Sequence, residues 1–183
     1  NQDGVVKGTN YQRYNFQTKN DFKKGFFSAG TNLILSFSHD KPLHEESRGG
    51  MIGTILQNVP TLEKYDDSHV GGYGGTYGDI ANLPNPLAMV DSNIMDRYNE
   101  NVKIFANLYA QIEFFKGLKY KLNLTPDFTF ERYKKYVNKY DFGLNTNTVT
   151  QLTERQRRRR NILVENLLTF DRTFGDHKIS ALA

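Results

Sequence analysis

Apolar and polar residues alternate along six segments of the chain, with the two-residue period of a β-strand that has one covered face. Residues 24–38 show the period most cleanly, because Phe27, Leu33 and Leu35 alternate with small polar residues. The six predicted strands are residues 11–19, 24–38, 101–115, 118–132, 157–172 and 178–183. The pattern therefore predicts an all-β protein whose strands each have an apolar and a polar face.

The connections between these strands alternate in length. Residues 20–21, 116–117 and 173–176 form short links, whereas residues 39–98 and a tyrosine-rich stretch that ends near residue 151 are long. A chain that crosses a bilayer repeatedly has short turns on one side and long loops on the other. The strands also exceed the roughly 9 to 11 residues needed to cross a bilayer when tilted. We therefore expect an antiparallel transmembrane β-barrel segment of about six strands, with the remaining strands outside this sequence.

Alternation alone leaves a second class open, a soluble β-sandwich that binds glycan. The mean hydropathy of -0.63 does not decide between them, because inward and outward residues of a barrel strand average out. No apolar stretch approaches the roughly 20 residues of a spanning helix, and the absence of Cys excludes thiol nucleophiles, Cys-ligated zinc and disulfides. The chain starts without Met or an apolar signal core, so we expect a processed or excised segment.

The end of the chain carries a specific resemblance. Residues 166–183 read Asn-Leu-Leu-Thr-Phe-Asp-Arg-Thr-Phe-Gly-Asp-His-Lys-Ile-Ser-Ala-Leu-Ala. This run resembles a recurring stretch in the SusC/RagA family of TonB-linked outer-membrane transporters, with Phe170, Arg172, Lys178 and Ile179 as mild departures. Residues 13–16 with 30–33, and residues 59–66 with Gly78 and 85–88, agree in the same order, so the resemblance covers nearly the whole chain.

The resemblance implies a protein of the bacterial cell outer membrane, with a barrel of about 22 strands closed by an internal plug. It implies a TonB box and plug before Asn1, through which a TonB complex acts, and a SusD-like surface lipoprotein as a lid. The expected function is import of a large polar nutrient, an oligosaccharide first and a peptide second. We expect a transporter and not an enzyme, without a cofactor, because the four His are scattered and no Ser lies in a nucleophile elbow.

The two strand faces predict different surroundings. Leu108 is expected to face outer-membrane lipid near the middle of its strand. The opposite face would line the lumen and hydrate a polar solute, and from it we take Asn107 and Gln111 as candidate substrate-binding residues. The lumen-facing residues are Arg13, Asn32, Lys103, Asn107, Gln111, Glu113, Lys119, Asn123 and Asp127.

The long stretch 39–98 holds the other binding candidates. Glycine and tyrosine dominate residues 71–78, where Tyr73 and Tyr77 could stack on a sugar and glycine would allow close approach, although a purely structural loop is the more frequent explanation. Asp66 and Asp67 are further ligand candidates. Together with Asp79 they could hold a hard cation, but their spacing fits no known calcium loop and we predict no metal. Residues 47–58 are predicted to form a short amphipathic helix that packs through Met51, Ile55 and Leu56.

Five arginines stand out in residues 155–160. In a soluble protein they would suggest contact with phosphate or nucleic acid. In a strand they alternate between faces, and no aromatic platform interleaves with them, so we predict no nucleic-acid binding. We expect them at the outer end of the fifth strand, where guanidinium groups meet lipid phosphates outside and loop carboxylates inside.

Overall fold

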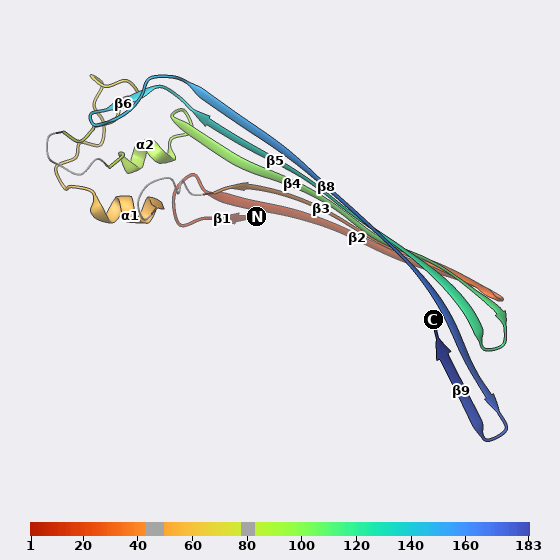
Figure 1. Cartoon of the computed structure of the whole chain (residues 1–183). Coiled ribbons are helices and arrows are strands. Elements are labelled where there is room, and N and C mark those ends of the chain that lie inside the picture. The colour runs from red at the N-terminus through yellow and green to blue at the C-terminus, as the bar shows by residue number, and fades with distance from the viewer. Residues whose placement is uncertain (43–49, 78–82) are drawn as a thin grey trace. The chain divides into compact units, whose positions relative to one another are not determined.

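The computed structural model describes residues 1–42, 50–77 and 83–183. Its main feature is an antiparallel sheet of seven strands in the order β1-β2-β3-β4-β5-β8-β9, so that strands close in sequence are neighbours in the sheet (Figure 1). A second sheet pairs β6 with β7. The all-β prediction is therefore confirmed. The strands span Gln2–Asp3 (β1), Asn10–Lys24 (β2), Phe27–Lys41 (β3), Met95–Phe115 (β4), Leu118–Val137 (β5), Tyr140–Phe142 (β6), Asn145–Asn147 (β7), Gln151–Phe174 (β8) and His177–Leu182 (β9).

The structure corrects the first predicted turn. We expected a break at residues 20–21, but β2 continues to Lys24 and the chain turns at Gly25 and Phe26. Gly25 has a φ of 58°, a conformation that glycine adopts without steric cost. The other short connections lie at Lys116–Gly117 and Gly175–Asp176, where the glycines again have positive φ, and residues 42–94 and 138–150 form the long ones. The predicted alternation of connection lengths is confirmed.

The chain divides into two compact units. Unit 1 consists of Asn1–Arg13, Ser38–Glu100 and Glu131–Gln156, and unit 2 of Tyr14–Phe37, Asn101–Phe130 and Arg157–Ala183. The strands β2, β3, β4, β5 and β8 each contribute residues to both units.

Unit 1 contains the hydrophobic core. Its buried residues Ala88, Ile94 and Phe142 are joined by the partly buried Tyr73, Met95 and Tyr140. The core is built on the helix α2 (Pro86–Val90), which begins with Asn85 as its N-cap and Pro86 in its first turn. The Asn85 amide also donates to the carbonyls of Glu63, Lys64 and Gly74, so it fastens the preceding loop to the helix.

The other helix, α1 (Gly50–Gln57), differs from the prediction in its buried face. Met51 and Thr54 are buried, whereas Ile55 and Leu56 are exposed. The Thr54 hydroxyl donates to the Gly50 carbonyl one turn earlier, so this short polar side chain can lie on the packed face. Residues 47–49 of the predicted helix lie outside the described residues.

Unit 2 is a sheet without a second layer. All of its residues are described, and Gly30 and Ala106 are its only buried ones. Most of its exposed large apolar side chains share one face, which we call the apolar face. Tyr14 stacks on Phe37 across β2 and β3 on this face, and Tyr120 of β5 donates to Asn166 of β8. The exposed members are Tyr14, Phe16, Phe22, Leu35, Phe37, Val102, Leu108, Phe114, Leu122, Ile162, Val164 and Leu168.

The opposite surface of unit 2 is the polar face. Gln17 donates to Asn32 across β2 and β3, and Asn107 donates to Thr125 across β4 and β5 at 2.9 Å. Lys103 and Asp127 form an ion pair at 3.6 Å on the same surface. The predicted separation of the strand faces is thus present in the contacts between strands.

Among the residues that the structure describes, no helix is long and apolar enough to cross a membrane.

Candidate functional site

Four of the six candidate binding residues lie in the loop of unit 1 between α1 and α2. Hydrogen bonds from Asp66 N–H to the Gly72 carbonyl and from Gly72 N–H to the His69 carbonyl close a tight turn there. Gly71 and Gly72 adopt φ values of 106° and 75°, which disfavour other residues. The backbone of this turn therefore requires glycine at positions 71 and 72.

Three glycines of this loop, Gly71, Gly74 and Gly75, also pack closely against the chain itself. A Cβ added to Gly71 would lie 3.1 Å from the Phe142 ring, and one added to Gly74 or Gly75 would overlap backbone atoms of Glu63 or Phe142. Thr76 forms a β-bridge with Gly143 at the same place. These close approaches account for Gly71, Gly74 and Gly75 by packing within unit 1, which is the structural explanation that the sequence left open.

Asp66 helps to hold the turn. Its carboxylate accepts hydrogen bonds from the Ser68 hydroxyl at 2.6 Å and the Ser68 N–H at 2.9 Å, and it lies 3.3 Å from the His69 ring. The Ser68 hydrogen bonds lower the pKa of Asp66 below its ordinary value. Asp66 is therefore an anion at neutral pH. The side chain of its neighbour Asp67 is exposed.

Tyr73 is a structural anchor of the loop. Its hydroxyl donates to Asp91 at 2.7 Å, and its ring packs edge-on against Phe142 with centroids 5.9 Å apart. Burial and the Asp91 carboxylate raise the pKa of Tyr73 to about 12. Burial alone would raise the pKa of Asp91, but hydrogen bonds from Asn93 and Tyr73 outweigh it and lower that pKa. The pair is thus a neutral donor and an ionised acceptor.

Tyr77 and Tyr65 present the exposed rings of the loop. Their exposed fractions are 54% and 65%, and the Tyr77 ring stacks on His69, to which its hydroxyl is hydrogen-bonded. Partial burial and the negative charges of Asp66, Asp141 and Glu63 raise the pKa of Tyr77. We call Tyr65, Tyr77, Asp66 and Asp67 the ring patch. Rings with nearby carboxylates can stack on a sugar and accept hydrogen bonds from its hydroxyls.

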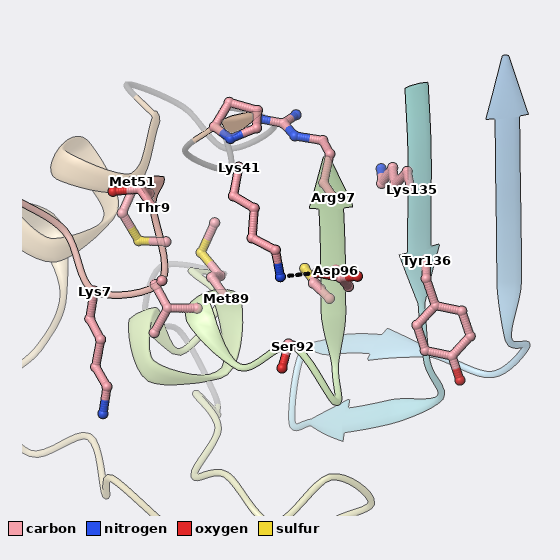
Figure 2. A pocket seen from close by; sticks show the side chains of 14 residues that line it. Lys7, Thr9, Lys41, Met51, Met89, Ser92, Asp96, Arg97, Lys135 and Tyr136 are labelled. Carbon is pink, nitrogen blue, oxygen red and sulfur yellow. Dashed lines mark hydrogen bonds and ion pairs between the residues drawn. The ribbon is translucent and has the colours of Figure 1, made fainter. Parts of the chain in front are cut away.

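Unit 1 also contains a pocket that the sequence did not indicate (Figure 2). Its volume is about 160 Å³, which is smaller than a typical small-molecule site and suits one group of a larger ligand. All three methionines of the chain, Met51, Met89 and Met95, line it, and Lys41 pairs with Asp96 at 3.0 Å. Its lining residues come from β3, both helices, β4, β5 and the chain before β2. Such dispersion leaves no local sequence signal.

The other two candidates, Asn107 and Gln111, belong to the polar face of unit 2. Asn107 is bound to Thr125, whereas Gln111 lines a pocket of about 330 Å³ together with Asp21, Tyr109 and Lys119. The Tyr109 hydroxyl donates to Asp21 at 2.9 Å, so β4 reaches across β3 to β2. This is possible because Gly30 of β3 has no side chain: a Cβ there would overlap Tyr109 and lie 2.5 Å from Asp21.

Ion pairs cross the strands within unit 1. His39 of β3 and Arg132 of β5 lie 3.6 and 3.7 Å from Glu100 of β4, and Arg132 also pairs with Glu154 of β8 at 3.1 Å. Arg155, the first residue of the arginine run, lies over the Tyr133 ring. No group of three or more residues that could hold a metal ion is found in the described parts of the chain, and Asp79 lies outside them.

The fold and these surfaces define a class: an all-β segment in which one unit has a core and candidate binding loops, and the other is a sheet with an uncovered apolar face. No family model matches the chain. The chain is similar to TonB-dependent receptor P3 of Formosa agariphila, with 26% identity over 196 aligned positions that cover 99% of this chain. The chain spans 18% of the length of that relative.

Proposed function

We propose that the chain is part of the barrel wall of a TonB-dependent outer-membrane transporter of the SusC/RagA type. The observation that carries the proposal is the apolar face of unit 2, where phenylalanine and leucine are exposed on a sheet without a second layer. In water such a face would be costly, whereas lipid would cover it without a protein partner. Similarity to a TonB-dependent receptor along the whole chain supports the same function.

The residues that come next along three of these strands also support the proposal. On β3, β4 and β5, the residues Phe37, Val102 and Phe130 belong to the apolar face. The next residues on the same side of these strands are His39, Glu100 and Arg132, which form the ion-pair network. An apolar band that gives way to paired charges on several adjacent strands is the pattern of a wall that leaves the hydrocarbon and enters water. In unit 2, β4 and β5 provide residues 101–115 and 118–130, which exceed the roughly 9 to 11 residues of a tilted span.

The imported solute is proposed to be a large polar nutrient, an oligosaccharide or, second, a peptide. The ring patch favours the oligosaccharide, because an exposed tyrosine such as Tyr77, on which the Asp66 carboxylate acts, suits a surface of alternating C–H faces and hydroxyls. Asn107 and Gln111 would hydrate the solute on the polar face. A SusD-like surface lipoprotein as lid, and a TonB complex that acts through a region outside this chain, complete the proposal, and the chain itself carries out no catalysis.

A soluble glycan-binding β-sandwich is the alternative function. A sandwich covers the apolar face of one sheet with a second sheet about 10 Å away. In the described residues the second sheet is the small β6–β7 hairpin of unit 1, and the apolar face of unit 2 is exposed. This observation favours the barrel wall.

Fractionation of cells that produce the full-length tagged protein tests the proposal. We expect the protein in the outer-membrane fraction, with gel mobility that changes on boiling, because folded barrels resist detergent unfolding until heated. A soluble protein with unchanged mobility would instead support the glycan-binding sandwich.

A further inference from the structure

Two arginines of β8 lie on the apolar face. Glu154 and Asn166 of β8 contact Arg132 and Tyr120 of β5, and both contacts fit one register between these strands. Side chains two residues apart in a strand point to the same side. Arg158 and Arg160 therefore lie on the face that Asn166 marks, whereas Arg157 and Arg159 lie on the polar face.

Their surroundings on this face are apolar. The same register places Arg158 opposite Phe128 and Arg160 opposite Pro126 of β5, and Ile162 is the next residue of β8 on that side. Between Leu122 and Phe130 of β5, and between Gln156 and Val164 of β8, no position of this face is a carboxylate. Within the described chain, Arg158 and Arg160 have no hydrogen bond or ion pair, unlike Arg132 with its two glutamates.

We propose that Arg158 and Arg160 bind the phosphate headgroup of an anionic glycolipid of the outer leaflet, while Phe128 and Ile162 contact its acyl chains. Guanidinium groups bind phosphate through paired, charge-assisted hydrogen bonds. A lipid-facing arginine is costly in hydrocarbon but not at the depth of the headgroups, which its long side chain can reach. The site rests on the proposed function, because it requires the apolar face to lie in a membrane.

Titration of the full-length protein in neutral detergent with phosphorylated lipid A, followed by native mass spectrometry, tests the site. The double variant R158Q/R160Q should bind the lipid roughly thirtyfold more weakly, as expected for two interfacial cations. R157Q/R159Q on the polar face is the matched control and should change binding less than twofold. Dephosphorylated lipid A should bind all three proteins equally.

The outcomes separate the two proposals. Absence of heat-modifiable mobility in the wild-type protein would overturn both. A heat-modifiable protein in which both double variants weaken lipid binding equally, or in which the phosphate makes no difference, would overturn the lipid site alone. Displacement of the lipid by millimolar inorganic phosphate would also overturn it, in favour of a site for a free anion.

Discussion

At the scale of single residues, the contact of Tyr109 with Asp21 shows how one glycine joins three strands. The tyrosine of β4 crosses β3 at Gly30 and donates to the aspartate of β2. Gly30 is one of the two buried residues of unit 2, because the ring covers it. Gly30 therefore allows the hydrogen bond between Tyr109 and Asp21 because it has no side chain in the way.

Changing Gly30 to Ala should destabilise the full-length protein by about 1 to 3 kcal/mol, because the added methyl overlaps the Tyr109 ring. Unfolding in denaturant, followed by the protection of the protein from trypsin, would measure this loss of stability. In a Tyr109→Ser background the same change should cost much less, since the obstructing ring is gone. Equal losses in the two backgrounds would show that the contact does not determine the need for glycine.

The hydrogen bond from Tyr73 to Asp91 predicts a pH dependence. Because the pKa of Tyr73 is raised to about 12, its contribution to stability is complete below pH 10, the ordinary tyrosine value, and is lost as the pH rises through about 12. Tyrosinate absorbance of wild-type protein and Tyr73→Phe should differ by one group that titrates near pH 12. A difference curve centred near pH 10 would contradict the assignment.

The ring patch predicts which tyrosine matters for binding. Tyr77→Ala should weaken binding of the preferred oligosaccharide, found by glycan-array screening of the full-length protein, by up to roughly tenfold, the value of one aromatic contact. Val149→Ala, which removes an exposed apolar side chain from another loop, is the control and should have no effect. Equal binding by wild type and Tyr77→Ala would remove the patch from the proposal.

At the scale of elements, the six strands could be predicted because their period of two is strong, but their ends could not. The strands β4 and β8 begin at Met95 and Gln151, six residues before the expected starts, where charged residues replace the apolar ones. Alternation of hydropathy disappears there, although pairing continues. The helix α2 was also missed, and the Asn85–Pro86 cap before a short apolar run was its available signal.

The face assignment of β4 predicts opposite responses from two neighbours. Leu108→Arg should lower stability by about 2 to 4 kcal/mol if the residue lies at the bilayer midplane. Asn107→Arg lies on the polar face beside Thr125 and should cost much less. Unfolding of the purified protein in lipid vesicles measures both, and an equal loss would contradict the assignment.

At the scale of the whole molecule, the candidate site shows where sequence reasoning stops. Tyr73 and Tyr77 are four residues apart, yet one anchors the core while the other is exposed. That difference depends on Asp91, His69 and Phe142, whose proximity is a product of tertiary packing. The alternation in the sequence predicted Asn107 and Gln111 on the polar face of β4, where the structure also has them. It gave no indication of the pocket in unit 1 or of the pocket that Gln111 lines.

The unequal distribution of buried residues predicts how the chain of 183 residues behaves alone. Unit 2 has no core, so in water its apolar face should drive association. Analytical ultracentrifugation should therefore detect large oligomers in water and smaller particles in detergent. A soluble monomer that melts in one cooperative transition would contradict the barrel wall, because its apolar face would then have an internal partner.

The two-residue turns at Gly25, Gly117 and Gly175 also have a kinetic consequence. They join β2 to β3, β4 to β5 and β8 to β9, so each pair closes a short loop, and hairpins form within microseconds. Pairing of β3 with β4 must instead close over residues 42–94, at a larger entropic cost. The chain should therefore assemble from hairpins that form first. Pairing of β3 with β4 should come last, so these two strand edges should need the protection of a chaperone for the longest time.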